Sequence, residues 1–220
     1  MFHLPLRRRV PSTLPGKGLY AITNGPRDDL LDAACAALQG GARVLQYRDK
    51  TNDAPRRLTE ARALAQVCLK FGVPLIINDD VELAMMCGAA GVHLGEGDAE
   101  IASARAAMGT GAIIGISCYD SLQRARDAAA AGADYLAFGV FFPSQTKPHR
   151  RRSSPKLLHE AKPLGLPLVA IGGISPDNGA PLIEAGADYL AAISAVFDAP
   201  DIRAEAQRFS DLFTTTPIRS

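Results

Sequence analysis

The chain has 220 residues, with 24 lysines and arginines against 23 aspartates and glutamates, so its formal net charge is only +1. That balance argues against nucleic acid or an anionic membrane surface as the main partner, because both require a clear basic excess. A hydrophobic fraction of 47% and a charged fraction of 21% exclude disorder over most of the chain. No apolar run approaches the roughly 20 residues that span a bilayer.

The first residues are basic but carry no apolar stretch, so we do not expect a cleavable secretory signal. The cysteines show no CxxC spacing and lie singly in apolar surroundings; they are Cys35, Cys68, Cys87 and Cys118. We therefore expect free thiols and a cytoplasmic protein, with disulfides or a zinc site as lesser alternatives.

Short β-branched runs alternate with Ala/Leu-rich segments from end to end. Predicted strands are 18–23, 43–48, 74–79, 91–95, 113–118, 135–139, 168–174 and 189–194, and predicted helices include 28–39, 56–71, 120–131 and 176–185. Continuous apolar strands are typical of parallel sheets covered on both faces. Eight such units predict an α/β fold, a single (β/α)8 TIM barrel with parallel strands over 18–213. A basic extension (1–17) and a tail (214–220) flank it, and a doubly wound open sheet is the alternative.

An internal repeat supports the barrel. AGADYLA occurs at 131–137 and again at 185–191, with related forms at 40–46 and 88–94. Each predicts a helix end with a left-handed glycine, followed by the next strand. We interpret the repeat as a shared loop solution rather than a functional site. It places the opposite ends of the strands on the face where barrel enzymes bind substrates.

The second strand ends in a charged run, residues 46–50. Strand alternation puts Gln46 and Arg48 on one face and Tyr47 on the other, and Lys50 joins the first pair if the chain stays extended. Two cations and an amide at a barrel mouth form a plausible anion site. A solvated charged loop is the alternative.

The third strand and the fourth βα loop bring carboxylates to neighbouring positions. Asp79 ends the third strand and Asp98 ends the sequence GEGD. Mg2+ typically takes one or two protein carboxylates, with phosphate oxygens and water completing its shell. We favour a metal ligand for Asp79, whereas Asp98, like Asp80, could instead cap a helix.

Ser117 and His93 have weaker functional signals. Ser117 lacks a GxSxG elbow, so a serine hydrolase is not expected. A hydrogen bond to a phosphate or ring substituent suits this serine better, with a structural serine as the alternative. His93 alternates with apolar residues, and we expect a hydrogen-bonded core histidine rather than a catalytic base.

The last three βα loops predict phosphate contacts. The long loop 138–155 offers Ser144, Thr146 and Lys147 beside an apolar patch, and its arginines at 150–152 are interpreted as a solvated turn. Gly173 lies near the end of the predicted seventh strand, and Ser194 ends the predicted eighth. Glycines let backbone amides approach an anion closely, and barrel phosphate sites often lie between these two loops.

Together these motifs resemble the thiamine-phosphate synthase family. The blocks that carry the resemblance are QYRDK (46–50), IIND (76–79), GVHLGEGD (91–98), IGIS (114–117), GVFFPSQTK (139–147), VAIGGIS (169–175) and AAISA (191–195). The resemblance implies that 4-amino-5-hydroxymethyl-2-methylpyrimidine diphosphate is joined to 4-methyl-5-(2-hydroxyethyl)thiazole phosphate. The products are thiamine phosphate and pyrophosphate.

The resemblance also assigns residues to ligands. For the pyrimidine diphosphate they are Gln46, Arg48, Lys50, Asn78, Ser117 and Lys147, of which Lys147, Arg48 and Ser117 are the catalytic candidates. For the thiazole phosphate they are Ser144, Thr146, Gly173, Ile193 and Ser194. Asp79 and Asp98 are the implied Mg2+ ligands, and the partners are small-molecule substrates.

Three positions depart from the family pattern: Ser144 replaces Thr, Asn24 stands where Asp is usual, and Glu96 where Gln is expected. A thiazole tautomerase-like isomerase is one alternative, but it does not need the diphosphate-binding set. A non-catalytic phosphate-binding barrel is the other, and it predicts ligand binding without release of pyrophosphate. Whether the protein is a homo-oligomer, and whether its first 17 residues are ordered, is left open by the sequence.

Overall fold

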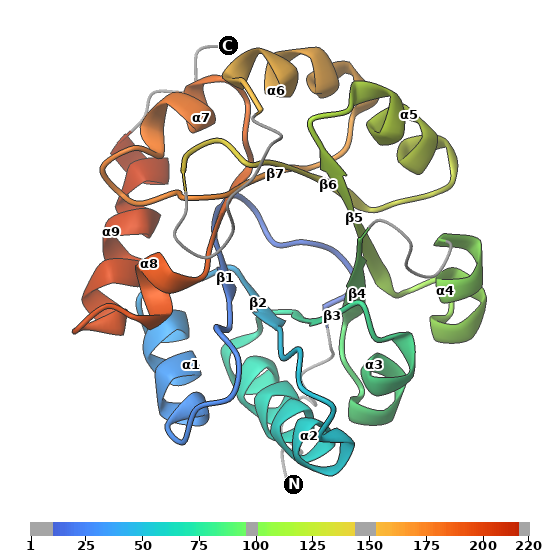
Figure 1. Cartoon of the computed structure of the whole chain (residues 1–220), viewed down its shortest axis with the longest axis vertical. Coiled ribbons are helices and arrows are strands. Elements are labelled where there is room, and N and C mark those ends of the chain that lie inside the picture. The colour runs from blue at the N-terminus through green and yellow to red at the C-terminus, as the bar shows by residue number, and fades with distance from the viewer. Residues whose placement is uncertain (1–10, 96–100, 144–152, 216–220) are drawn as a thin grey trace, which may run out of the picture.

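The computed structural model describes residues 11–95, 101–143 and 153–215, and its strands close into a barrel (Figure 1). Strands β1 to β8 follow one another around the barrel in chain order, and all pairs are parallel. The last strand pairs with the first, with Leu19 opposite Leu190. The predicted parallel barrel is confirmed, and the open sheet is excluded.

The strands are short and the helices form an outer ring around them (Figure 1). The strands are β1 (Gly18–Ile22), β2 (Val44–Tyr47), β3 (Leu75–Asn78), β4 (Gly91–Leu94), β5 (Ile113–Tyr119), β6 (Tyr135–Phe138), β7 (Leu168–Ile171) and β8 (Tyr189–Ala192). The helices are α1 (Leu30–Gln39), α2 (Ala54–Phe71), α3 (Val81–Cys87), α4 (Ile101–Met108), α5 (Leu122–Ala130), α6 (Pro155–Ala161), α7 (Ala180–Glu184), α8 (Ser194–Phe197) and α9 (Ile202–Thr215), with a short 3-10 helix η1 (Lys162–Leu164).

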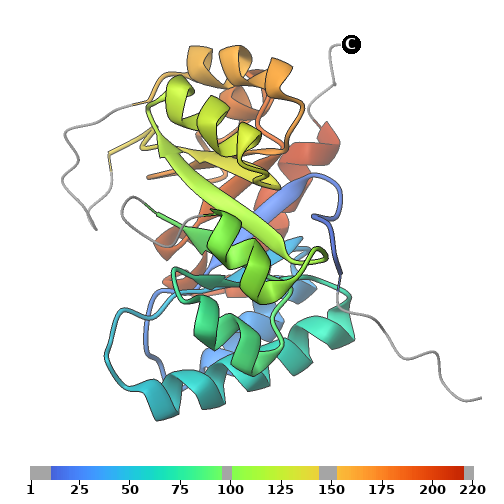
Figure 2. The same cartoon turned by 90° about the vertical axis from the view of Figure 1, so that its right-hand side faces the viewer.

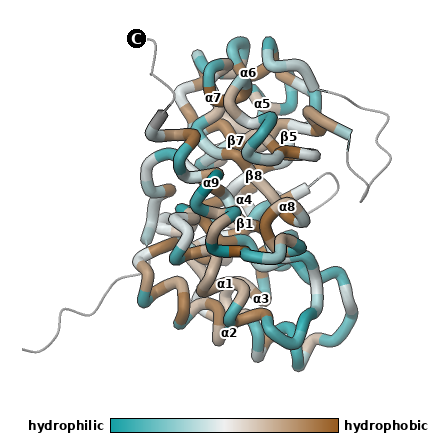
Figure 3. The backbone as a smooth tube through the Cα atoms, turned by 90° about the vertical axis from the view of Figure 1, so that its left-hand side faces the viewer, coloured by the Kyte–Doolittle hydropathy of each residue, from teal (hydrophilic) through white to brown (hydrophobic). Residues whose placement is uncertain are grey.

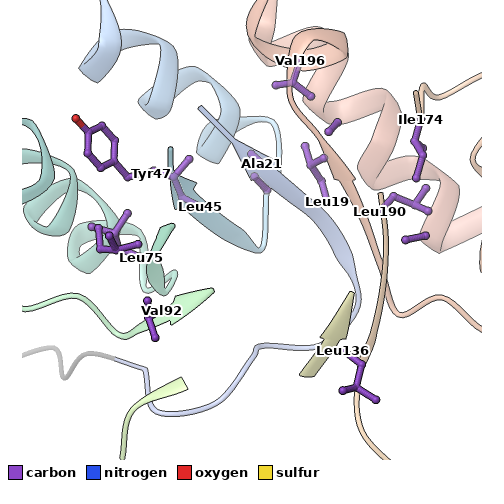
Figure 4. Close-up of a cluster of buried hydrophobic side chains, with 14 of the residues drawn as sticks. Leu19, Ala21, Leu45, Tyr47, Leu75, Val92, Leu136, Ile174, Leu190 and Val196 are labelled. Carbon is purple, nitrogen blue, oxygen red and sulfur yellow. The ribbon is translucent and has the colours of Figure 1, made fainter. Parts of the chain in front are cut away.

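Strand alternation divides the core into two layers. One buried cluster fills the barrel and includes Tyr20, Val44, Tyr135 and Tyr189. The other lies between the strands and the helices and includes Leu45 together with many helix residues. Figure 3 shows hydrophobic stretches on strands such as β7 and on helices such as α1 and α2, and Figure 4 shows side chains of the helix-facing layer. Successive residues of one strand therefore serve different layers.

Several predicted elements end earlier or begin later than the apolar pattern suggests, and the predicted seventh strand (168–174) ends at Ile171. The predicted helix 176–185 is reduced to α7, because the chain first makes a turn in which the Ser175 amide donates to Asn178 Oδ1 at 2.9 Å. The predicted eighth strand ends at Ala192, and Ser194 begins α8. Side-chain hydrogen bonds of this kind compete with helix formation.

The four copies of the repeat share one backbone solution. Gly41, Gly88, Gly132 and Gly186 all have positive φ, at 95°, 69°, 90° and 111°. This is the conformation predicted for them, and it costs a glycine little. The interpretation of the repeat as a shared loop is confirmed.

The two identical copies share a further contact. Asp134 accepts a hydrogen bond from the amide of Ile114 at 2.7 Å, and Asp188 accepts one from the amide of Leu168 at 3.0 Å. In both cases the aspartate side chain accepts a hydrogen bond from a backbone amide at the start of the preceding strand. The repeat therefore closes the N-terminal ends of β5 and β7.

The chain before β1 covers this same end of the barrel. Leu14 packs against the interior cluster, and Lys17 forms an ion pair with Asp188 at 3.1 Å. Figure 2 shows the segment before β1 at one end of the barrel and the β2–α2 connection at the other. Among the described residues, no helix is both long and apolar enough to cross a membrane.

Gly115 leaves the space that the Tyr135 ring occupies inside the barrel. A Cβ added at Gly115 would lie 1.9 Å from a Tyr135 ring carbon, whereas one added at the exposed Gly111 would meet nothing within 4 Å. We expect Gly115→Ala to lower the free energy of unfolding by about 1–3 kcal/mol, as overpacking does. Gly111→Ala is the matched control. Denaturant unfolding of both variants measures the effect, and equal stabilities would contradict the packing argument.

Candidate active site

The polar side chains predicted at the strand ends lie along the C-terminal rim of the barrel. Lys50, Gly173 and Ser194 are exposed there. Arg48, Asn78, Asp79, Ser117 and Ile193 are partly exposed, and Gln46 is buried. The rim is therefore lined by the expected residues, with Gln46 below them in the barrel interior.

The charged run after β2 keeps the alternation of the strand. Gln46 faces the barrel interior, where its Nε2 donates to the Tyr20 hydroxyl at 2.8 Å. Tyr47 faces the helices, and Arg48 returns to the rim side. Lys50 pairs with Asp79 across the gap between β2 and β3. The run therefore continues from β2 onto the rim, where Lys50 is exposed and Arg48 is partly exposed.

The end of β3 has an unusual backbone. Asp79 has φ of 64°, which non-glycine residues rarely adopt, and its amide donates to the His93 carbonyl at 2.8 Å. Its carboxylate accepts from Asn78 Nδ2 at 2.6 Å and pairs with Lys50. Asp80, by contrast, caps α3 by accepting the Leu83 amide at 2.9 Å, as the capping alternative predicted.

A chain of hydrogen bonds crosses the barrel interior beneath the rim. The hydroxyls of Tyr20 and Tyr135 are 2.7 Å apart, and Tyr135 lies 2.9 Å from His93 Nδ1. The other ring nitrogen of His93, Nε2, lies 2.9 Å from Ser117 Oγ. With Gln46 at its start, the chain links two residues predicted to bind substrate. His93 is the hydrogen-bonded histidine that the sequence predicts.

One direction of donation gives each tyrosine proton in this chain an acceptor. In this direction Gln46 donates to Tyr20, the Tyr20 proton is directed to Tyr135, and the Tyr135 proton to His93 Nδ1. His93 then carries its proton on Nε2 and donates to Ser117. The Ser117 hydroxyl keeps its own proton for another acceptor at the rim.

Burial keeps this chain neutral. Desolvation raises the pKa of both Tyr20 and Tyr135 well above the usual tyrosine value, so both remain hydrogen-bond donors. Desolvation lowers the pKa of His93 to about 4, against a smaller opposing effect of Asp79. A neutral imidazole can accept from Tyr135 and donate to Ser117 at once, which an imidazolium cannot do.

The ends of β7 and β8 bring a glycine turn and a short helix to adjacent strands. Gly172 and Gly173 have φ of 106° and 63°, and a Cβ at Gly173 would lie 2.5 Å from the Pro143 carbonyl oxygen. Both conformations therefore require glycine. Ile193 precedes α8 and contacts the interior cluster, while Ser194 is its exposed first residue. At this part of the rim, backbone groups rather than charged side chains are available to a ligand.

Asn24, which departs from the family pattern, has a local role. Its Nδ2 donates to Asp198 Oδ1 at 2.6 Å. Nearby, Arg27 donates to the Phe197 carbonyl at 2.7 Å and to Asp29. These contacts fasten the β1–α1 loop to the end of α8.

Several predicted residues lie outside the described residues. They are Ser144, Thr146, Lys147, Asp98, Glu96 and the arginines at 150–152.

Sequence reasoning missed Tyr20 and Tyr135 as members of this hydrogen-bonded chain. The signal was present: Tyr135 occupies the tyrosine position of the AGADYLA repeat, and Tyr20 stands two residues before the inward-facing Ile22. Inward positions of a barrel filled by tyrosine and histidine require hydrogen-bond partners, which a packing interpretation does not supply.

The low pKa of His93 makes stability depend on pH. In the unfolded chain histidine binds a proton near pH 6.5, whereas in the folded protein it does so near pH 4. Stability should thus be complete above pH 6.5 and fall by up to about 3 kcal/mol as pH drops toward 4. His93→Gln should flatten this slope in denaturant unfolding at pH 7, 6 and 5. Parallel curves for the two proteins would contradict the shift.

Comparison with known proteins identifies the family. The family model described as thiamine monophosphate synthase matches residues 19–196. The chain is 52% identical over 206 residues to a thiamine-phosphate synthase of Xanthomonas campestris pv. campestris, covering 93% of this chain and 100% of that protein. It is also 52% identical over 208 residues to a thiamine-phosphate synthase of Thiobacillus denitrificans, covering 93% and 98%.

A solved structure supports the same family. The thiamine phosphate pyrophosphorylase from Pyrococcus furiosus superposes with a TM-score of 0.82 at 31% identity, covering 90% of this chain and 96% of that one. These matches confirm the expected transferase of thiamine biosynthesis over the alternative barrels. The chain belongs to the thiamine monophosphate synthase family.

Proposed function

We propose that this enzyme condenses the pyrimidine diphosphate with the thiazole phosphate in a Mg2+-dependent, dissociative reaction at the barrel rim. The observation that carries the proposal is the arrangement of Arg48, Lys50 and Asp79 at β2 and β3, apart from the glycine turn at β7. The charged side chains at the ends of β2 and β3 suit a diphosphate with its cation. The glycine turn after β7, which offers backbone groups, suits a single phosphate.

The diphosphate substrate would occupy the side of the rim formed by β2 to β5. Arg48 and Lys50 supply charge, and Asn78 and Ser117 supply neutral hydrogen bonds. The free Ser117 proton suits a diphosphate or ring acceptor. Gln46 lies deeper, where its amide suits the pyrimidine ring rather than the phosphates, and Lys147 would approach from the sixth βα loop.

The thiazole phosphate would lie across the ends of β7 and β8. Gly173 and Ser194 are exposed there, and Ile193 offers an apolar surface to the ring. Ser144 and Thr146 would add hydroxyls from the sixth βα loop. This arrangement sets the thiazole against the pyrimidine over the barrel axis, so that position and orientation contribute much of the rate.

The residues at β3 fit a magnesium ion. Asp79 is a partly exposed carboxylate that already pairs with a cation, the ammonium of Lys50. No cluster of three or more His, Cys, Asp and Glu side chains that could hold a metal occurs among the described residues. Mg2+ suits such a site, because it uses few carboxylates and completes its shell with phosphate oxygens and water. Asp79 and Asp98 would hold it, and Lys50 would turn from Asp79 to the diphosphate.

The chemistry needs charge stabilisation rather than a nucleophilic side chain. The bond between the pyrimidine methylene carbon and the diphosphate oxygen breaks, and its electron pair leaves with pyrophosphate. The aminopyrimidine stabilises the resulting cation, and the lone pair of the thiazole nitrogen forms the new C–N bond. Arg48, Lys50 and Lys147 stabilise the departing charge. Bound Mg2+ would supply further charge neutralisation of the leaving group.

We also propose a cytoplasmic location. Cys35, Cys68, Cys87 and Cys118 are all free thiols, which suits a reducing compartment.

The direct test combines the purified protein with both substrates and Mg2+. We expect thiamine phosphate and pyrophosphate to appear in equal amounts, and EDTA to abolish both. Product formation that persists in EDTA would contradict the metal requirement. Binding of the thiazole phosphate without any product would contradict the transferase reaction.

Lys147 provides a test of leaving-group stabilisation. We expect Lys147→Ala to lower turnover by about 10²–10³-fold, the usual loss when one group stabilising transition-state charge is removed. Lys156→Ala is a matched control, because Lys156 is an exposed lysine on α6 that pairs with Glu160 along its own helix. A turnover rate for Lys147→Ala within a few-fold of the parent would show that Lys147 does not have this role.

A further inference from the structure

Asp49 lies between the two rim cations in sequence, yet its side chain is fully buried away from the rim. Its Oδ2 pairs with Arg56 of α2 at 2.7 Å, and its Oδ1 accepts the Thr51 amide at 2.7 Å. Arg56 also donates to the Thr51 hydroxyl at 2.6 Å. A buried carboxylate is retained only where it is fully paired, and Asp49 meets that condition. Its contacts fasten the β2–α2 loop to the first turn of α2.

A second layer of contacts holds Arg56 in place. Glu60 of α2 accepts from Arg56 Nη1 at 2.9 Å and from the Tyr47 hydroxyl at 2.6 Å. Tyr47 belongs to β2 and points toward the helices (Figure 4). The outward residues of the 46–50 run, Tyr47 and Asp49, are thus both tied to α2.

The Arg48 main chain is held from the opposite side by Thr23, at the end of β1. The Thr23 hydroxyl accepts from the Arg48 amide at 2.8 Å and donates to the Arg48 carbonyl at 3.2 Å. Thr23 is fully buried, and its own amide donates to the Gln46 carbonyl at 3.0 Å. One hydroxyl therefore satisfies both polar groups of the Arg48 main chain.

We propose that Thr23 and Asp49 are positioning residues that hold Arg48 and Lys50 for the diphosphate group. Neither side chain reaches the rim, because both are buried behind it. What they hold is the backbone of residues 48–50, which is not part of the β2 ladder. A cation on a backbone fixed in advance loses less freedom on binding than one on a loose loop. The inference rests on the proposed function of Arg48 and Lys50.

The Thr23 test uses an isosteric pair. Thr23→Val keeps the shape but leaves the Arg48 amide and carbonyl without their partner, while Thr23→Ser keeps the hydroxyl. We expect Thr23→Val to weaken inhibition by inorganic pyrophosphate, and to raise KM for the pyrimidine diphosphate, by about ten- to a hundredfold. KM for the thiazole phosphate should be unchanged, and Thr23→Ser should restore pyrophosphate affinity.

The Asp49 test has a matched control at the other end of the barrel. Asp134 also pairs with an arginine, Arg105, at 2.7 Å and accepts a backbone amide. We expect Asp49→Asn to weaken pyrophosphate binding selectively, as Thr23→Val does. Asp134→Asn should leave pyrophosphate affinity unchanged. Calorimetric titration with pyrophosphate and Mg2+ gives this readout without turnover.

The outcomes distinguish the positioning role of Thr23 and Asp49 from the proposed diphosphate-binding role of Arg48 and Lys50. If Arg48→Ala leaves pyrophosphate affinity unchanged, the proposed diphosphate role of this rim is wrong. If Arg48→Ala weakens binding but Thr23→Val does not, Thr23 is merely structural and the positioning role is overturned. A parallel rise in both KM values for Thr23→Val and Asp49→Asn would also overturn it. Should Asp49→Asn fail to fold, the Thr23 pair decides alone.

Discussion

The alternation of side chains along eight closed strands is the constraint on which this site depends. In a parallel barrel each strand sends every second residue inward and the others toward the helices. β2 shows the consequence, because Gln46 enters the interior, Tyr47 enters the helix layer, and Arg48 returns to the rim side. A shift of one residue would bury the cation and expose the tyrosine. The register of the barrel therefore determines which charges a substrate can meet.

The barrel interior of this chain is not purely apolar, and buried polar groups lower stability unless they are hydrogen-bonded. Tyrosine hydroxyls and an imidazole placed there must find partners, since a buried unpaired polar group destabilises by about 1–3 kcal/mol. Tyr20, Tyr135 and His93 partner one another, and Gln46 and Ser117 end the chain on either side. Gly115 makes room for the Tyr135 ring. The same residues therefore determine both the packing under the rim and the hydrogen bonding of Ser117 at the rim.

The fold was predictable from the sequence because its signals are local and repeated. Eight apolar runs and the glycine of each repeat copy are enough for the barrel and for the approximate positions of its strands. Partners distant in sequence were not predictable in this way. Thr23 and Arg48 are 25 residues apart, and Tyr20 and Tyr135 are 115 apart. Nothing in their local patterns requires the contact, whereas the closed topology brings each pair together.

The strained backbone at Asp79 depends both on the closed topology of the barrel and on the polar contacts of the rim. A non-glycine residue with positive φ costs roughly 1–3 kcal/mol and persists only where its surroundings hold it. Here the amide of Asp79 is held by the His93 carbonyl, and its carboxylate by Asn78 and Lys50. An extended Asp79 would continue β3 and send its carboxylate elsewhere. Local preference is thus overridden at the residue whose carboxylate pairs with Lys50 at the rim, and departures from local rules of this kind are expected at functional sites.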